Sequence, residues 1–510
     1  MENFMNLVKT ELDNTNLIET ENGALGYVST GKALLDINFS TMSLRNATEE
    51  EIIEKFTKAY YEHKTYALVW LFFSRDVREG MGERRLFRVI FEWLCNTHTE
   101  DARRLIQLIS EYGRWDDILC AIGTKLQSEV ISLCKEQLEL DLDGFANEYP
   151  ISLLAKWLPS ANTSSYKTRK LAKIMYKGFG MNEKEYRKTL SLLRSYLDVV
   201  EVKISANRWN EVNYSAVPSK ANLLYNNAFW KHDAERREEF INRVQNGEEK
   251  INAGTLYPSD IVHKYTTNNG WYVKDETDAT LEELWKALPD YVNGQGNTIC
   301  VADGSGSMTI SAGGNSSVTC LEVANALAIY FAEHSSGCFA NKYITFSESP
   351  QFVDFSNANT LREKLEIALE YDEVANTNIE KVFELLLNTA ITNNLSQSEI
   401  PNVLILSDLE FDRMTSDNTS HYGCRKTLFK EIEQKWNDAG YTLPKLTFWS
   451  IASRSGAMPV NTHENFPVAL VSGYSPTVME MVLSNETDPY KCLIKMLEKE
   501  RYDAVRDALR

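Results

Sequence analysis

From residue 298 onward, short apolar runs alternate with helical patterns, and this alternation constrains the fold more than any other feature of the chain. The expected strands are Thr298–Ala302, Lys342–Phe346, Asn402–Ser407, Lys445–Ile451 and Val468–Val471. The expected helices between and after them are Cys320–His334, Leu361–Glu370, Ile379–Asn388, Arg425–Ala439 and Pro476–Leu483. Such alternation predicts a doubly wound, Rossmann-like α/β domain with a mainly parallel sheet over residues 293–487.

Oxygen-bearing side chains follow two of these strands. The loop Asp303-Gly304-Ser305-Gly306-Ser307 comes directly after the first strand, and Asp408 ends the strand 402–407. Thr377 lies just before the helix that starts near residue 379. Ligands of open α/β sheets bind at the carboxyl ends of the strands, and oxygen donors suit Mg²⁺ or Mn²⁺. We therefore predict a metal site whose ligands are Asp303, Ser305, Ser307, Thr377 and Asp408.

The spacing of residues disfavours several enzymatic sites. Gly-x-Ser-x-Gly is not satisfied around Ser305 because residue 303 is Asp, and no Walker A loop is present. The eight cysteines form no Cys-x-x-Cys pair and His is rare, so zinc chemistry is not expected. We predict a binding protein rather than an enzyme, and catalytic use of the metal is the weakest of the alternatives.

Residues 48–292 have the pattern of successive short helices. Thr48 is expected to cap the helix 49–63 with Glu51, three residues on, and apolar residues recur three or four apart in 83–96. This succession of short helices predicts an all-α, HEAT-like helical-repeat ring or arch. Residues 1–47 remain as an N-terminal segment, and residues 488–510 are expected to form a C-terminal helix.

Charge is distributed unevenly along the chain. The net charge is -18, yet residues 151–210 hold 12 Lys and Arg against 4 Asp and Glu, with tyrosines and Trp209 among them. Cations can neutralise phosphates and aromatic rings can stack on unpaired bases. The predicted RNA-binding residues are Lys156, Lys167, Arg169, Lys170, Lys173, Lys177, Arg187 and Lys188. A solvated basic face, or a dock for the acidic second half of the chain, would explain the same pattern.

The Asp-x-Ser-x-Ser loop, the loop threonine and the strand-end aspartate together resemble the metal-ion-dependent adhesion site of von Willebrand factor A domains. The resemblance covers roughly residues 297–485 and fills all five ligand positions. It implies that the two serines and the threonine coordinate the ion directly or nearly so, while the aspartates act largely through water. It also implies that an open coordination position accepts an acidic group from a protein partner.

Residues 74–85 and 112–118 of the helical half resemble TROVE-like modules, so that the chain resembles the Ro autoantigen family. More specifically, residues 152–160 and 217–221 resemble segments of an uncharacterised TROVE-like family. The resemblance implies a helical ring that binds noncoding RNA, and a ribonucleoprotein function. Arg75 and Arg84 could line a phosphate path or pair with neighbouring acids. A protein-binding scaffold without nucleic acid remains the alternative function.

Three features of the sequence indicate the cellular compartment of the protein. The first residues are polar and acidic, without the basic start and apolar run of a secretory signal. The longest apolar run is far shorter than the ~20 residues that cross a bilayer. Singly placed cysteines are typical of a reducing compartment. We expect a cytoplasmic protein that does not bind membranes.

Overall fold

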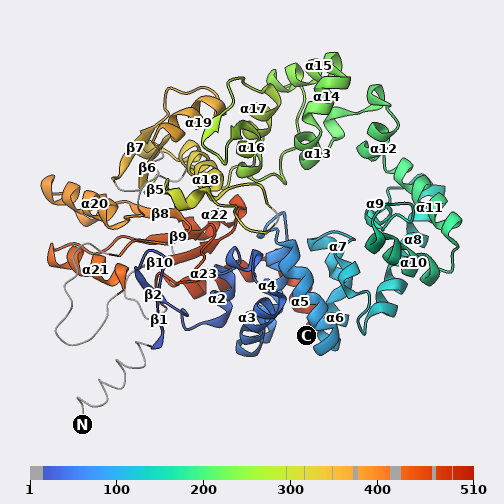
Figure 1. The fold of residues 1–510 in the computed structure, drawn as a ribbon, viewed down its shortest axis with the longest axis horizontal. Coiled ribbons are helices and arrows are strands. Elements are labelled where there is room, and N and C mark those ends of the chain that lie inside the picture. The colour runs from blue at the N-terminus through green and yellow to red at the C-terminus, as the bar shows by residue number, and fades with distance from the viewer. Residues whose placement is uncertain are drawn as a thin grey trace, which may run out of the picture. The chain divides into compact units, whose positions relative to one another are not determined.

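A six-stranded sheet forms the centre of the α/β part of the chain (Figure 1). Its spatial order is β10-β9-β8-β5-β6-β7, and all neighbours are parallel except β7, which runs antiparallel to β6 at one edge. The strands are β5 Thr298–Asp303, β6 Lys342–Phe346, β7 Gln351–Asp354, β8 Asn402–Ser407, β9 Leu446–Ser450 and β10 Val468–Ser472. The prediction of a mainly parallel sheet joined to a helical region is confirmed.

The edge strand β7 was not expected from the sequence. It has four residues, and only Val353 among them is buried. A strand this short and this exposed lacks the apolar run that marked the other five. Its position at the edge explains the pattern, because one side of an edge strand faces no neighbouring strand.

The order of strands reverses between β5 and β8. From β5 the chain continues to β6 on one side, whereas β8 continues to β9 on the other side. β5 and β8 are parallel and paired, with Ala302 opposite Leu406, so their carboxyl ends lie together. In open α/β sheets this reversal opens a crevice in which ligands bind.

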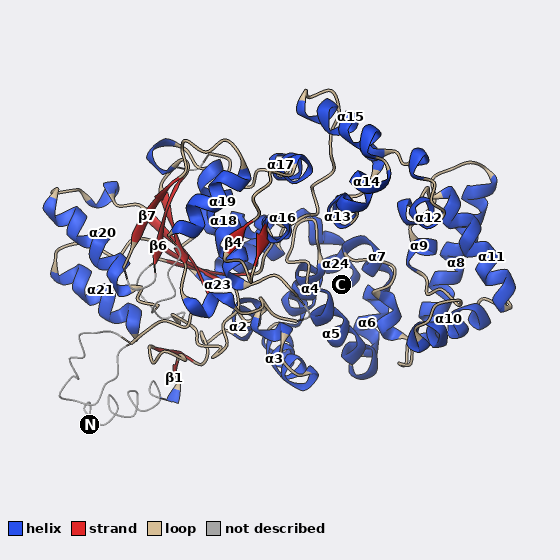
Figure 2. Cartoon of the chain, turned by 45° about the horizontal axis from the view of Figure 1, so that its top comes forward, coloured by secondary structure: helices blue, strands red, loops and turns tan. Residues whose placement is uncertain are grey.

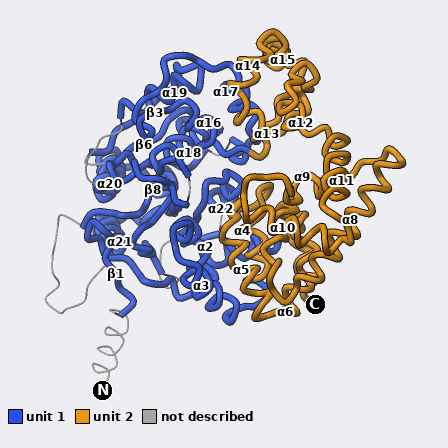
Figure 3. Tube along the Cα trace, turned by 45° about the vertical axis from the view of Figure 1, so that its right-hand side comes forward, with its two compact units in different colours: residues 1–67, 256–499 blue, residues 68–255, 500–510 orange. Residues whose placement is uncertain are grey.

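The computed structural model describes residues 15–294, 296–314, 316–346, 349–371, 377–413, 427–461, 467–484 and 486–510. The chain divides into two compact units (Figure 3). The α/β unit comprises residues 1–67 and 256–499, and the helical unit comprises residues 68–255 and 500–510. Within the described ranges, no helix is both long and apolar enough to span a bilayer.

These units cut across the linear division expected from the sequence. Residues 256–292, expected in the helical half, join the α/β unit because helix α16 Pro258–Tyr265 packs against α18 Cys320–His334. The N-terminal segment also joins it, since α2 Ala33–Phe39 packs against α3 Glu49–Glu62 and against β10. The expected C-terminal helix is broken into α23 Pro489–Leu497 and α24 Asp503–Ala508, of which only α24 belongs to the helical unit.

Helix α18 packs against the centre of the sheet, in contact with β5, β6 and β8 (Figure 2). Every residue from Cys320 to Ala332 is buried. Thr319 caps its first turn and Glu322 completes the capping box. The remaining elements of the α/β unit include β1 Leu17–Glu19, β2 Leu25–Tyr27, β3 Thr266–Thr267, β4 Tyr272–Val273, α17 Ala279–Lys286, α19 Leu361–Glu370, α20 Glu380–Thr392, α21 Leu428–Asp438 and α22 Met479–Leu483.

The helical unit consists of short helices joined by short connections, as the sequence predicted. Its helices include α4 Lys64–Arg75, which crosses from the first unit, α5 Arg84–Thr97, α6 Thr99–Leu105, α7 Ile109–Tyr112, α8 Gln127–Ala146, α9 Leu154–Trp157, α10 Tyr166–Gly178, α11 Glu183–Tyr196, α12 Val200–Ser205, α13 Ser219–Leu224, α14 Asn226–His232 and α15 Ala234–Gln245. In the other unit, the predicted capping box of α3 is confirmed, with Thr48 and Glu51 bonding reciprocally.

Asp117 organises the ion pairs of the helical unit. Its buried carboxylate lies 2.7 Å from Arg75 Nη2 and accepts a hydrogen bond from Arg88 Nε at 2.6 Å. Burial alone would raise the pKa of Asp117, but Arg75 and Arg88 hold it below its usual range. Arg84 pairs with Asp116 and Asp117. Arg75 and Arg84 therefore make structural ion pairs, with these two aspartates rather than with the acids beside them in sequence.

Candidate metal centre and basic groove

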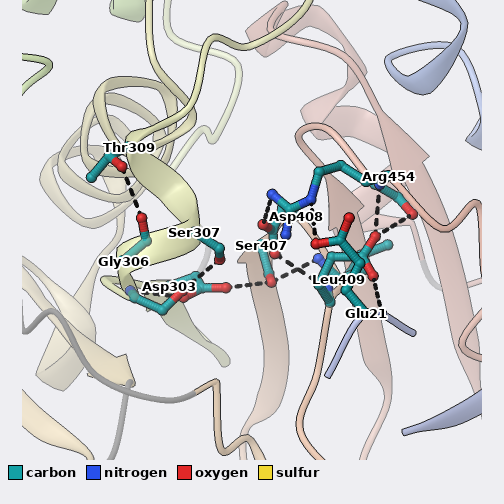
Figure 4. A network of polar contacts seen from close by, with 12 residues as sticks. Glu21, Asp303, Gly306, Ser307, Thr309, Ser407, Asp408, Leu409 and Arg454 are labelled. Carbon is teal, nitrogen blue, oxygen red and sulfur yellow. Dashed lines mark hydrogen bonds and ion pairs between the residues drawn. The ribbon is translucent and has the colours of Figure 1, made fainter. Parts of the chain in front are cut away.

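Asp303 is the last residue of β5, and its carboxylate is buried at the carboxyl edge of the sheet (Figure 4). Its Oδ1 accepts a hydrogen bond from Ser305 N at 3.0 Å, and its Oδ2 accepts one from Ser407 Oγ at 2.6 Å. Ser305 Oγ and Ser307 Oγ lie 3.0 Å apart. The Asp-x-Ser-x-Ser loop thus brings two hydroxyl groups together beside a buried carboxylate.

Asp408 follows β8 and is fully buried. Its Oδ1 accepts a hydrogen bond from Glu410 N at 3.2 Å. Burial raises the pKa of Asp408 against the opposing effect of the Arg454 guanidinium. Burial also raises the pKa of Asp303, and the negative charge of Asp408 raises it further. Two carboxylates at the ends of adjacent strands are therefore both buried and close enough for their charges to interact. A cation bound beside them would favour their ionised forms.

One oxygen of this cluster lacks a hydrogen-bond donor. Asp408 Oδ2 is buried with no hydrogen-bond partner among the described residues. Arg454 Nη1 lies 3.1 Å away, as an ion pair outside hydrogen-bond geometry. The Arg454 guanidinium offsets part of the charge on this oxygen, and a bound cation would offset it further. The donor set of carboxylates and hydroxyls fits the hard ions Mg²⁺ and Mn²⁺.

The cluster is poor in the side chains that usually mark a metal site. Within the described segments, no group of three His, Cys, Asp or Glu residues is placed to hold a metal. Two carboxylates alone would make a weak site. A cation here would therefore depend on the hydroxyl oxygens of Ser305 and Ser307 as well.

Thr377 is buried just before α20. Its carbonyl oxygen accepts a hydrogen bond from Asp412 N at 3.0 Å. This bond connects Thr377 to the segment that leaves Asp408, and so to the same region of the sheet edge. The preceding residues 375 and 376 lie outside the described residues. Coordination by the Thr377 hydroxyl stays a prediction.

Three further residues complete the polar surroundings of Asp408, and sequence reasoning missed them. Arg454, which follows β9, donates from Nε to Glu21 Oε2 at 2.8 Å (Figure 4). Glu410 Oε2 accepts a hydrogen bond from Glu21 N at 2.9 Å, and Glu410 Oε1 accepts one from Arg454 N at 2.7 Å. No local pattern marks this contact, because Glu21 and Arg454 are 433 residues apart.

The predicted RNA-binding cations fall into two groups in the structure. Three of them line a groove of about 1230 Å³ in the helical unit. We call this the basic groove; it lies between the end of α9, the loop 158–163, α11 and α12. Its cationic side chains are Lys156, Lys184, Arg187, Lys188 and Arg194, and Glu201 is the one acidic side chain among its lining residues. Lys184 and Arg194 were not predicted.

The other five predicted cations lie on α10. Lys167, Arg169, Lys170, Lys173 and Lys177 are exposed to solvent, and none of them lines the basic groove. The sequence placed all eight in one basic stretch, but the fold distributes them over three helices, with Lys156 on α9, five cations on α10, and Arg187 and Lys188 on α11. A single interface containing all eight is therefore not what the fold presents.

Two contacts shape one wall of the basic groove. Arg194 donates hydrogen bonds to the carbonyl oxygens of Ala155 and Leu158, both at 2.8 Å, so it holds the loop rather than projecting freely. The Arg114 guanidinium lies 3.9 Å from the centroid of the Trp157 ring and covers part of it. Lys184, Arg187 and Lys188 are exposed on α11 at helical spacings of three and four, so they share one face.

Two domain families match the chain. A domain of unknown function, DUF2828, matches residues 20–112 and 124–298, which is more than half of the chain. The chain belongs to the DUF2828 family. A second domain of unknown function, DUF7788, matches residues 297–507 of this DUF2828 protein. The boundary between the two matches falls at the start of β5, the strand that ends at Asp303.

A viral protein is similar to this DUF2828 chain over most of its length. The uncharacterized protein L728 of Acanthamoeba polyphaga mimivirus is 28% identical over 527 residues, covering 95% of this chain and 87% of the viral protein. Neither domain family has a described function. The resemblances to von Willebrand factor A domains and to the Ro family therefore stay predictions.

Proposed function

We propose that the α/β unit is a von Willebrand factor A-type module that binds Mg²⁺ or Mn²⁺ and presents it to an acidic group of a protein partner. The observation that carries this proposal is the convergence of Asp303, Ser305, Ser307 and Asp408 where the strand order reverses. The buried Asp408 Oδ2, which lacks a hydrogen-bond donor, supports it. Bound metal would neutralise the two carboxylates and offer a Lewis-acidic position to an incoming carboxylate.

Titration of the full chain with MgCl₂ or MnCl₂, followed by calorimetry, tests this proposal. Asp303→Asn keeps the shape of the side chain but removes its charge, so we expect the affinity to fall at least about tenfold. The matched control is Asp354→Asn, which removes an exposed carboxylate at the end of β7. Equal affinities of the wild type and Asp303→Asn would contradict the proposal.

We further propose that the helical unit binds noncoding RNA, which is what the Ro-family resemblance implies. The observation that favours this function over a protein-binding scaffold is the excess of cations in the basic groove. Exposed Lys184, Arg187 and Lys188 can reach successive phosphates. The favoured function for the whole chain is thus RNA binding, together with a metal-dependent A-type module.

Charge reversal on the two cationic surfaces tests the RNA proposal and locates the interface. Changing Lys184, Arg187 and Lys188 together to Glu should weaken binding of a roughly 12-nucleotide oligo(U) strand at least about tenfold at low salt. The salt slope should fall by about 0.7 for each lost phosphate contact. The matched variant changes Lys167, Lys170 and Lys173 to Glu on α10. Unchanged anisotropy with both variants would contradict RNA binding.

A further inference from the structure

A serine, a histidine and a glutamate lie in series on the surface of the α/β unit. Ser317 Oγ lies 2.9 Å from His263 Nε2. His263 Nδ1 lies 2.9 Å from Glu322 Oε2 and 3.0 Å from Glu322 Oε1. The three residues come from the loop before α18, from α16 and from the first turn of α18. None of them belongs to the metal centre described above.

The buried glutamate determines which ring nitrogen of His263 carries hydrogen. Glu322 is buried, and hydrogen bonds from His263, Thr266 and Thr319 N hold its pKa below the usual range despite its burial. An ionised carboxylate only accepts hydrogen bonds, so His263 Nδ1 must donate to it. In neutral His263 this leaves Nε2 as an acceptor for the Ser317 hydroxyl proton. That is the arrangement in which a histidine acts as general base for a serine.

The surroundings hold Glu322 in place and keep water from it. Thr266 Oγ1 donates a hydrogen bond to its Oε1, and Thr319 N donates one to its Oε2 at 2.8 Å. The turn between β3 and β4 packs over it, because a Cβ on Gly270 would lie 3.0 Å from Glu322 Cγ. Glu322 therefore has a fixed orientation, and it fixes the His263 ring in turn.

Ser317 itself is exposed to solvent. We propose that Ser317 is an activated nucleophile that attacks carboxylic esters, with His263 as its general base and Glu322 as the residue that positions His263. A bond forms between Ser317 Oγ and the ester carbonyl carbon while the Ser317 proton moves to His263 Nε2. The bond to the leaving alcohol then breaks, and the alcohol oxygen takes that proton. Water releases the acid by the same proton route and restores the Ser317 hydroxyl.

The contacts of His263 and Glu322 could also serve only to stabilise the fold. The His263–Glu322 pair connects α16 to α18, and Glu322 also completes the capping box of α18. Neither of these structural contacts needs Ser317 to react. The reactivity of Ser317 therefore distinguishes a catalytic role from a purely structural one.

The test is covalent labelling of the full chain with a tagged fluorophosphonate, with the labelled peptide identified by mass spectrometry. We expect an adduct on Ser317 and none on that peptide in Ser317→Ala. His263→Asn retains a donor toward Glu322 but has no base, so labelling should slow by about 100-fold or more. Ser316→Ala, a change of the adjacent serine, should label like the wild type.

Hydrolysis of p-nitrophenyl acetate gives a second readout that does not depend on the folding of the His263 variant. Ser317 is exposed, so Ser317→Ala should retain the wild-type melting temperature while losing the turnover. Absence of a Ser317 adduct in the wild type would overturn the proposal. So would equal turnover in Ser317→Ala, or labelling of folded His263→Asn at the wild-type rate.

Discussion

Asp303 and Asp408 are carboxylates buried close together, and protons or cations must offset their charge for both to remain there. Arg454 supplies part of that charge through its 3.1 Å ion pair with Asp408. Glu21 holds Arg454 from the other side at 2.8 Å. In the metal-free protein, Arg454 is thus the nearest positive charge to Asp408 that the described residues show. A bound Mg²⁺ would add the charge that one shared guanidinium does not provide.

The raised pKa of Asp303 predicts a pH dependence of stability in the metal-free protein. Burial, and then the charge of Asp408, raise the pKa of Asp303 from 3.8 to about 7 in the fold. Between these values the folded state binds more protons than the unfolded state, so the contribution of Asp303 to stability falls as pH rises. In EDTA, the free energy of unfolding should therefore decline less steeply from pH 4 to 7 in Asp303→Asn than in the wild type.

With Mg²⁺ present, the contribution of Asp303 to stability should rise with pH instead of falling, because a metal binds the ionised carboxylate and releases its proton. The rise in melting temperature on adding Mg²⁺ should be larger at pH 8 than at pH 5. Asp354→Asn serves as the control, since Asp354 is exposed and its pKa is lowered by hydrogen bonds from Ser356. Identical pH profiles of wild type and Asp303→Asn would show that Asp303 does not titrate in this range.

Among the secondary-structure elements, the end of α4 positions residues 74–85, one of the segments that resemble TROVE-like modules. After α4 the chain turns back onto it, with Met81 N donating to Phe73 O at 3.1 Å and Glu83 N donating to Ser74 O at 2.7 Å. The turn approaches α4 so closely that a Cβ on Gly80 would lie 2.0 Å from Phe73 O. Glycine is needed at residue 80 because of this close approach.

Gly80→Ala should therefore destabilise the helical unit by more than about 2 kcal/mol, since the backbone must shift to relieve the clash. Gly123→Ala is the matched control. Its Cβ would meet nothing within 4 Å, and only its φ of +95° opposes the change. We expect that control to cost about 1–2 kcal/mol. Urea unfolding of both variants measures the difference, and equal midpoints would refute the steric explanation.

In the molecule as a whole, the chain crosses between the two units three times, and its last residues complete the helical unit. Tyr502 is fully buried there, stacked on Tyr112 with ring centroids 5.7 Å apart and edge-on to Phe73 at 6.0 Å. Arg501 adds an ion pair with the buried Asp76 at 2.9 Å. The C-terminal residues are therefore part of the core of a unit that begins near residue 68.

Removal of the Tyr502 ring should leave a cavity between these aromatic side chains. Tyr502→Ala is expected to destabilise the helical unit by about 3–5 kcal/mol. Hydrogen exchange should quicken in residues 68–112, while strands β5 and β8 keep their protection. Arg510→Ala is the control, because Arg510 is exposed and pairs with Asp507 within its own turn. Unchanged exchange in Tyr502→Ala would mean that α24 does not support this unit.

The sequence by itself determined the features that depend on neighbouring residues. The periodicity of buried side chains predicted five of the six strands of the sheet and gave α18 its observed bounds. The Asp-x-Ser-x-Ser loop was recognisable because the residues that converge on Asp303 lie two and four positions after it. Asp408 was predicted at the same edge of the sheet, because Asp303 and Asp408 lie at the carboxyl ends of two parallel strands that pair with each other.

Only the tertiary structure decided the contacts between distant segments. It brought Glu21 and Arg454 to Asp408 across 433 residues, and it aligned His263 with Ser317 and Glu322 from separate elements. It also divided the eight predicted cations between α10 and the basic groove. Composition and periodicity record which face of an element is buried, but not which other element buries it. That pairing is set by packing of the whole chain, so no local pattern can contain it.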